Sequence, residues 1–305
     1  MAITIYQPTQ FGDTSGTLDG HAVGDAQNLT ESFTDLGGQD DGTLVGDADV
    51  LTAHAAGGDD TLGLTVFDGG SVIGDAIAMS GESLGGSDQI NVLARGSATV
   101  VGDAVTLGNF AQGGDDTISV NASYGPATVF GDAETMSGHA RGGNDMITGT
   151  ELHAALQLYG DAQTLSGWAV GGNDTLIAGP NPSNQTQLYG DSAALLDHAA
   201  GGNDTLVSGP NNDQMWGDAA TVARTATRGA DTFVFSPLNA HDSIEDFQPG
   251  QDHIELKGYT NVTSFAQLMP NIADTSAGAL ISFDANDSIL VVNDHHLSAG
   301  DFIFT

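Results

Sequence analysis

The chain has 305 residues, with 40 Asp and Glu residues against 5 Lys and Arg residues, so its formal net charge is −35 at pH 7. A surface this acidic repels nucleic acid and anionic lipid, which argues against both as partners, and it attracts cations. Cysteine is absent, which excludes disulfides and thiolate metal sites. No apolar run approaches the roughly 20 residues of a membrane helix, so no membrane insertion is expected.

The remaining composition indicates a folded, turn-rich protein. Hydrophobic residues make up 39% of the chain, which is too many for a disordered acidic tail. The 43 Gly residues are about twice the usual share of roughly 7%. Nearly all the acidic residues are Asp, often beside Gly, a preference that favours turns and the binding of hard cations. The N-terminal MAITIYQPTQ has neither the basic nor the apolar region of a standard signal peptide.

In chain order, residues 1–23 are predicted to form an N-terminal cap, and a repeat fills residues 24–235. A Gly-Asp turn recurs there at steps of mostly 28 to 30 residues. Its aspartates are Asp25, Asp47, Asp75, Asp103, Asp132, Asp161, Asp191 and Asp218. Internal repetition at such a period is typical of solenoid architectures.

A second turn, Gly-Gly-x-Asp, recurs out of phase with the first. Its aspartates are Asp60, Asp88, Asp116, Asp145, Asp174 and Asp204, followed by Asp231 in a degenerate copy. In these seven units the two aspartates are always 13 residues apart, whereas the first unit is looser and runs from Asp25 to Asp40 or Asp41. The fixed spacing identifies the geometrically constrained part of the unit.

Apolar residues also repeat in three columns. One follows the second turn, as at Ile118, one precedes Gly-Asp, as at Val100, and one lies in the 13-residue spacing between the two aspartates, as at Leu107. Each lies in a short run rich in Thr, Val, Ile and Leu, which is typical of short strands. One unit cannot bury its apolar face alone, but stacked units share a continuous core. We therefore predict an all-β fold, a parallel β-solenoid (β-roll or β-helix) of about eight coils of 28–30 residues.

In such a solenoid the aspartates of successive coils lie about 4.8 Å apart. Two unit charges at that distance repel by about 1 kcal/mol in water and by about 3–4 kcal/mol at an effective dielectric constant near 20. Calcium suits the required counter-charge because it takes 6–8 carboxylate and carbonyl oxygens, and Gly lets the backbone curl around it. Zinc and copper favour Cys or His. The sequence therefore predicts several Ca²⁺ ions along the two aspartate columns.

The two turns together carry a family resemblance. Gly160-Asp161-Ala162 and Gly172-Asn173-Asp174-Thr175-Leu176 resemble the two halves of the calcium repeat of RTX (hemolysin-type) proteins, separated by the insertion 163–171. The resemblance implies a secreted calcium-binding repeat protein that uses the type I secretion machinery. The insertion leaves open a coil of two faces or of three.

Residues 236–305 are predicted to form a small C-terminal cap. The segment 231–256 resembles the part that closes the calcium β-roll in serralysin-type proteins, and this resemblance makes Asp246 and Asp252 candidates for a last metal site. A short helix from Thr263 or Ser264 and two strands near 279–283 and 288–292 are expected next. The end, Asp301-Phe302-Ile303-Phe304-Thr305, is similar to an uncleaved type I secretion signal, and a cap alone is the other interpretation.

Three further patterns favour structure over chemistry. One repeat position holds histidine in three units and other side chains in the rest, which indicates a surface position that tolerates many side chains. Its residues are His54, Glu82, Phe110, His139, Trp168, His198 and Thr225. The Gly-x-Ser-x-Gly match at 81–85 lies inside a repeat, outside the strand–helix context of a hydrolase. The ladder of Phe130, Tyr159, Tyr189 and Trp216 favours packing over sugar binding. With no His-Glu-x-x-His motif, we predict that the chain is not an enzyme.

The leading hypothesis is a secreted, extracellular or surface-associated protein that folds on binding Ca²⁺ and has a structural, adhesive or surface-interaction role. Cell-surface or matrix polysaccharide or protein are its candidate partners. An accessory module of a secreted enzyme is one alternative, and a polysaccharide- or ice-binding solenoid is another. The last rests on a single threonine column, which Gln89 and Met146 interrupt: Thr61, Thr117, Thr175, Thr205 and Thr232.

Overall fold

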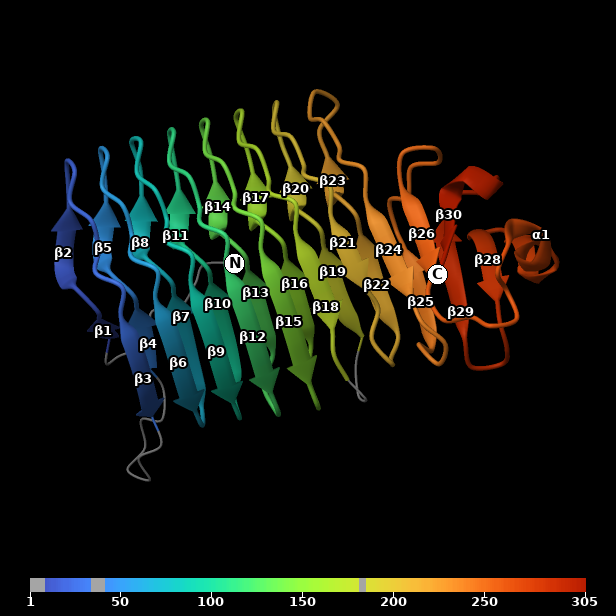
Figure 1. Cartoon of the computed structure of the whole chain (residues 1–305), viewed down its shortest axis with the longest axis horizontal. Helices are drawn as coiled ribbons and strands as arrows, with labels where there is room; N and C mark the ends of the chain where they lie inside the picture. The colour runs from blue at the N-terminus through green and yellow to red at the C-terminus, as the bar shows by residue number, and fades with distance from the viewer. Residues whose placement is uncertain (1–8, 34–41, 181–184) are drawn as a thin grey trace.

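The computed structural model describes residues 9–33, 42–180 and 185–305. It is a parallel β-solenoid in which coils stack along one axis (Figure 1). Each coil contributes one strand to each of three sheets, so hydrogen-bonded neighbours are three strands apart in the chain. The predicted parallel β-solenoid is confirmed, and the coil has three faces.

The first sheet has twelve strands, parallel up to β29 and antiparallel beyond it. In spatial order they are β1 (Thr9–Phe11), β4 (Gly42–Val45), β7 (Gly69–Ile73), β10 (Ser97–Val101), β13 (Ala127–Phe130), β16 (Leu156–Tyr159), β19 (Thr186–Tyr189), β22 (Asp213–Trp216), β25 (His241–Ile244), β29 (Ser288–Val292), β28 (Gly278–Ser282) and β27 (Ile272–Thr275).

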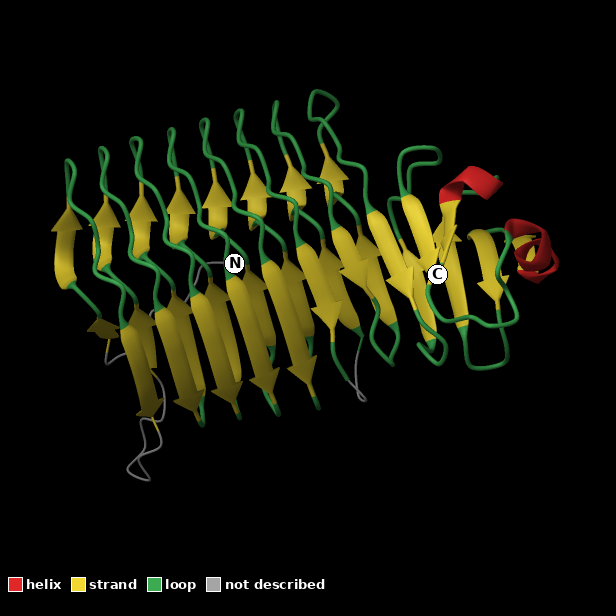
Figure 2. Cartoon of the chain, in the orientation of Figure 1, coloured by secondary structure: helices red, strands yellow, loops and turns green. Residues whose placement is uncertain are grey.

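The second sheet has eight parallel strands and forms the upper row in Figure 2. They are β2 (Thr14–Leu18), β5 (Ala48–Leu51), β8 (Ala76–Met79), β11 (Ala104–Leu107), β14 (Ala133–Met136), β17 (Ala162–Leu165), β20 (Ser192–Leu195) and β23 (Ala219–Val222). The third sheet has ten: β3 (Asn28–Phe33), β6 (Thr61–Val66), β9 (Gln89–Ala94), β12 (Thr117–Ala122), β15 (Met146–Glu151), β18 (Thr175–Ala178), β21 (Thr205–Val207), β24 (Thr232–Phe235), β26 (His253–Leu256) and β30 (Phe302–Phe304).

Three hydrophobic clusters run along the solenoid, two large cores and a smaller row that contains Phe130, Tyr159 and Tyr189. The first and third sheets enclose the larger core, where alternate residues such as Ile118 and Val120 of β12 are buried. This alternation places every second side chain of a strand on the inner face. The second sheet covers a smaller core built from Ala, Leu and Met, such as Ala104, Leu107 and Ala111. In each repeat coil the Gly-Asp turn lies just before the second-sheet strand, and the Gly-Gly-x-Asp turn lies just after the loop that follows this strand. Both turns are therefore at the junction between the two large cores, and the aspartate columns lie there.

Most loops after the second-sheet strands turn through one residue with positive φ, which is Ala53 (φ 59°) in the loop after β5. Gly81, Gly138 and Gly167 take this position with φ of 77°, 74° and 72°, and Asn109 and Asp197 take it with φ of 60° and 55°. Glycine, Asn and Asp tolerate this left-handed conformation best. The 13-residue spacing therefore encloses a second-sheet strand and a tight turn.

The C-terminal region continues only part of the coil. After β23 the second sheet ends, while β25, β29 and β26, β30 extend the first and third sheets. Helix α1 (Phe265–Leu268) and a 3₁₀ turn (Met269–Asn271) precede the antiparallel strands β27 and β28, and a second 3₁₀ turn (Ala299–Asp301) precedes β30. Within the described ranges no helix has the length and apolar character to cross a bilayer.

Candidate metal centre

Two rows of aspartates form a buried acid layer between the cores. The first column consists of Asp47, Asp75, Asp103, Asp132, Asp161, Asp191 and Asp218, and the second of Asp60, Asp88, Asp116, Asp145, Asp174, Asp204 and Asp231. Every one of these residues is 2% exposed or less. Carboxylates are rarely so buried without a partner of opposite charge.

First-column carboxylates accept a hydrogen bond from the second Gly of the Gly-Gly turn in their own coil. The Gly143 N–H donates to Asp132 Oδ1 at 2.6 Å, and the Gly114 N–H donates to Asp103 Oδ1 at 2.7 Å. The acceptor and donor are always 11 residues apart in such pairs, as for Asp161 and Gly172. These bonds tie the two turns of one coil together, which explains the constant spacing in the sequence.

Second-column carboxylates instead link successive coils. The backbone N–H of Asp88 donates to Asp116 Oδ1 at 2.7 Å, and that of Asp116 donates to Asp145 Oδ1 at 2.7 Å. The ladder continues to the last member, where the Asp231 N–H donates to Asp252 Oδ1 at 3.0 Å. Each carboxylate therefore uses one oxygen to hold the neighbouring coil in register.

The other carboxylate oxygen is without a hydrogen-bond partner in most members of the layer. Among the described residues, these buried atoms are Oδ1 of Asp47 and Oδ2 of Asp60, Asp88, Asp103, Asp116, Asp132, Asp145, Asp161, Asp174, Asp191, Asp204 and Asp231. A buried polar atom left unpaired costs about 1–3 kcal/mol, and more when it is charged. A row of such atoms indicates that a ligand completes the layer.

The glycines of the two turns keep this space open. A Cβ on Gly74 would fall less than 3.0 Å from both Asp88 Oδ2 and the carbonyl oxygen of Gly102. A Cβ on Gly113 would fall equally close to carboxylate oxygens of Asp103 and Asp132. Carboxylate and carbonyl oxygens thus converge where a side chain would otherwise lie, which is the donor set that Ca²⁺ takes in proteins.

Burial and mutual repulsion raise the pKa values of the layer. Burial raises the pKa of Asp60 and of Asp191 to about 7, and that of Asp132 to about 6. For Asp103, burial and then the charges of Asp116 and Asp132 raise the pKa well above its ordinary value. The layer therefore binds protons, or another cation, more readily than isolated carboxylates do.

Basic side chains provide almost no counter-charge. Within the part of the chain that the structure describes, Arg228 is the one Lys or Arg whose guanidinium or ammonium lies within ion-pair distance of the layer, at 3.6 Å from Asp218 Oδ2. No group of three or more Asp, Glu, His or Cys side chains among the described residues is arranged as a ready-made metal cluster. A cation in the layer would thus combine few carboxylates with backbone carbonyls and water.

The structure corrects the first repeat. Strand β1 pairs with β4, which places Asp13 rather than Asp25 beside Asp47, and the Asp25 N–H donates to Asp13 Oδ2 at 2.8 Å. Asp25 is exposed and occupies the register of Gly58. Gln27 takes the second-column position, since its N–H donates to Asp60 Oδ1 at 2.7 Å. Asp25 therefore lies outside the first column, because Gly24-Asp25 resembles a Gly-Asp turn in sequence but occupies the place of a Gly-Gly turn.

The remaining predicted ligands fall into two groups. Asp40 and its alternative Asp41 lie outside the described residues. The Asp246 side chain is 7% exposed and lies beside the end of the first column, but both of its oxygens accept backbone N–H groups, from Gly217 at 2.7 Å and from Asp218 at 3.2 Å. Asp252 also uses both oxygens, accepting from Asp231 and from Gln248.

The histidine position forms a stack of rings on the surface. The ring of Trp168 lies 5.3 Å from those of His139 and His198, and Trp168 is exposed. In the ladder that precedes the Gly-Asp turns, Phe130, Tyr159 and Tyr189 are buried and Trp216, stacked on Tyr189, is partly buried. Ser83 of the Gly-x-Ser-x-Gly match is fully buried.

The fold and the acid layer together define a parallel β-solenoid with a buried row of acidic side chains along its axis. Residues 21–304 match the family model described as Peptidase M10 serralysin C terminal, so the chain belongs to this family. The matched region is the non-catalytic C-terminal repeat region of serralysin-type proteases, with RTX-type repeats. A search of curated proteins found no match to the chain.

Proposed function

We propose that this chain is a secreted calcium-binding repeat protein whose solenoid is completed by Ca²⁺ bound along the acid layer. The observation that carries the proposal is the row of buried, unpartnered carboxylate oxygens. Family membership supports it, because serralysin C-terminal regions carry RTX-type repeats.

The layer as it stands is electrostatically unfavourable. Neighbouring members of a column repel by about 3–4 kcal/mol per pair at an effective dielectric constant near 20 and about 4.8 Å spacing. Protonation relieves this repulsion at low pH, and a divalent cation relieves it at neutral pH. Because the site exists only when coils are stacked, the free energy of binding adds to the free energy of folding.

The donor set favours calcium over other common cations. The converging atoms are carboxylate and carbonyl oxygens, as around Gly74 and Gly113. Zinc and copper favour sulfur and imidazole ligands. Magnesium demands a near-ideal octahedron and gives up water reluctantly. Calcium tolerates irregular shells of 6–8 oxygens, which a repeated turn can supply.

The C-terminal residues suit a chain that is exported before it folds. Strand β30 is the last member of the third sheet and pairs with β26, and Phe302 is buried in the larger core. We propose that this segment is read as a type I secretion signal in the unfolded chain and becomes the cap of the solenoid afterwards. Calcium outside the cell would drive that change.

A role as the accessory module of a secreted enzyme is the second candidate. The matched family is the C-terminal region of peptidases, which specifically favours this alternative. Co-purification of the chain with a neighbouring secreted enzyme, and loss of that enzyme's stability when the chain is removed, would support it.

The test of calcium-coupled folding is far-UV circular dichroism of metal-stripped protein at pH 7.5. Stepwise Ca²⁺ should produce a transition to a β spectrum, whereas equal Mg²⁺ should not. Equilibrium dialysis should show several Ca²⁺ ions bound per chain. A β spectrum and a melting temperature that neither metal removal nor Ca²⁺ changes would overturn the proposal.

A further inference from the structure

Arg228 occupies a position that is glycine in the interior coils. Thr227 pairs with Ala200, so Arg228 follows in the register of Gly201. A Cβ on Gly201 would fall less than 3.0 Å from carboxylate oxygens of Asp191 and Asp218. In interior coils this position therefore lies between first-column carboxylates of successive coils, where a side chain cannot fit.

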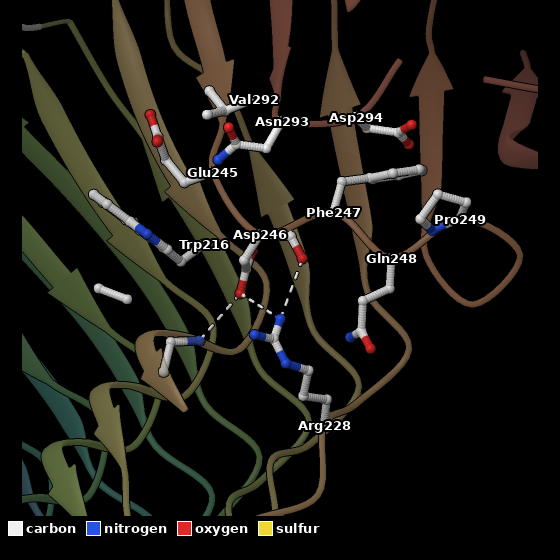
Figure 3. A pocket seen from close by; sticks show the side chains of 12 residues that line it. Trp216, Arg228, Glu245, Asp246, Phe247, Gln248, Pro249, Val292, Asn293 and Asp294 are labelled. Carbon is white, nitrogen blue, oxygen red and sulfur yellow. Dashed lines mark hydrogen bonds and ion pairs between the residues drawn. The ribbon is translucent and has the colours of Figure 1, made fainter. Parts of the chain in front are cut away.

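Space for a side chain opens at the last coil because the first column ends there. The register of Met215 with Ile244 brings Asp246 beside Gly217, and Phe247 follows it, so no aspartate succeeds Asp218 in the column. The second sheet also ends at β23, and a pocket of about 480 Å³ lies against Ala219 and Ala220 (Figure 3). Arg228 extends into this pocket.

The guanidinium bridges two buried carboxylates across the coil boundary. Arg228 Nη1 lies 3.6 Å from Asp218 Oδ2 and 3.6 Å from Asp246 Oδ2, and it donates to the Asp246 carbonyl oxygen at 3.3 Å. Figure 3 shows it reaching towards Asp246 beside Gln248. The Gln248 side-chain amide also donates to Asp218 Oδ2, at 3.2 Å.

The consequence is visible in the hydrogen bonding. Asp218 and Asp246 have no unpartnered buried oxygen, whereas Asp191 at the same position of the preceding coil has one. Asp231 in the second column of the last coil still has one, and Asp75 is an interior first-column member without one, because both of its oxygens accept from the Gly86 N–H. At the opposite end of the layer the Gln27 side-chain amide donates to Asp13 Oδ1, but Asp13 is exposed and Asp47 and Asp60 each keep an unpartnered oxygen. The charged side chain of Arg228 thus satisfies Asp218 and Asp246 at one end of the first column.

We infer that Arg228 is a built-in counter-ion that replaces a metal ion at the last coil boundary and ends the calcium column there. This inference rests on the proposed binding of calcium between the interior coils. A guanidinium stays charged at all physiological pH values and cannot dissociate from the chain. The boundary between Asp218 and Asp246 therefore keeps its counter-charge when calcium is absent.

The test compares Arg228→Gly with Arg224→Gly, a matched loss of one positive charge from an exposed side chain in the same coil. Equilibrium dialysis with ⁴⁵Ca²⁺ should show that wild-type protein and R224G bind the same number of ions and that R228G binds one more. R228G should also need several-fold more Ca²⁺ for half-maximal folding, because the Asp218–Asp246 boundary then depends on the metal.

Two further variants keep the inference testable if R228G does not fold. Arg228→Gln keeps a side chain of similar length without the charge, and Arg228→Lys keeps the charge. The calcium midpoint should rise for R228Q relative to Arg224→Gln and stay near wild type for R228K. Equal stoichiometry in R228G and R224G, or equal midpoints for R228Q and R224Q, would overturn the inference. If wild-type protein bound no calcium, the proposed function itself would fail.

Discussion

The interior coils and the last coil bury the same kind of carboxylate in different surroundings. Asp132 has one oxygen hydrogen-bonded to Gly143 and the other without a partner. Asp246 has two oxygens bound by backbone N–H groups and a guanidinium at 3.6 Å. Asp246 is thus fully satisfied by groups of the chain itself, whereas most aspartates of the interior coils keep one oxygen without a partner. The unsatisfied interior carboxylates are therefore a regular feature of the repeat that an external cation can complete.

The largest effect is expected when pH is varied in metal-stripped protein. Burial raises the folded-state pKa of Asp60 and Asp191 to about 7, so the folded chain holds more protons than the unfolded chain between about pH 4 and pH 7. The stability that these protons supply is fully present near pH 4 and is lost as pH rises through the folded-state pKa values.

For each carboxyl that is protonated in the folded but not in the unfolded chain, the free energy of unfolding should fall by about 1.4 kcal/mol per unit of rising pH across that window. Urea denaturation at pH 4.5, 5.5, 6.5 and 7.5 measures this slope. Saturating Ca²⁺ should abolish it, because the metal replaces the protons. Equal stability of the metal-stripped protein at pH 4.5 and 7.5 would show that the carboxylates are compensated in another way.

A Cβ inside the layer should have the next largest effect. Gly114→Ala places a methyl group less than 3.0 Å from the backbone carbonyl oxygen of Gly86, which cannot move without shifting the turn. We expect a loss of about 3 kcal/mol in saturating Ca²⁺. Gly108→Ala in the same coil is the control, since its Cβ would be no closer than 3.8 Å to Ser137 Oγ. Similar urea midpoints for the two variants would contradict the close approach of the turns.

The smallest effect, and the sharpest contrast, is expected from removing one charge. Asp132→Asn should stabilise metal-free protein at pH 7.5 and destabilise the calcium form, by about 1–3 kcal/mol in each direction, because it removes repulsion in one state and a ligand in the other. Asp246→Asn should destabilise both forms, since its carboxylate holds backbone N–H groups and Arg228. Thermal unfolding with and without Ca²⁺ separates these outcomes. A D132N variant destabilised equally in both states would count against a metal beside Asp132.

The C-terminal region was largely predictable in its local structure. The strands expected near 279–283 and 288–292 correspond to β28 and β29, and the short helix begins after Ser264 as expected. Their place in the fold was not predictable, because β29 joins the first sheet as a parallel neighbour of β25. Pairing over such a distance in the chain depends on which sheet edge is left open.

The residues at the two ends of the layer escaped prediction for a related reason. Asp13, Gln27 and Arg228 each differ from the repeat pattern at their position, so the repeat pattern does not identify them. Their signal in the sequence is a substitution at a repeat position, such as Arg for the first Gly in Arg228-Gly229-Ala230-Asp231. Only pairing in space shows what such a substitution touches.

By itself, the sequence determined the repeat, its parallel stacking and the alignment of aspartates in two columns, because regular spacing of Gly, Asp and apolar residues places the same turns in every coil. The burial of these columns is visible only in the structure. The tertiary structure decided the three-sheet coil, the true first unit and the partners of the terminal aspartates. These features depend on which strand edges pair in space. An interior coil can be inferred from the coils on both sides of it, whereas a terminal coil has a neighbour on one side only.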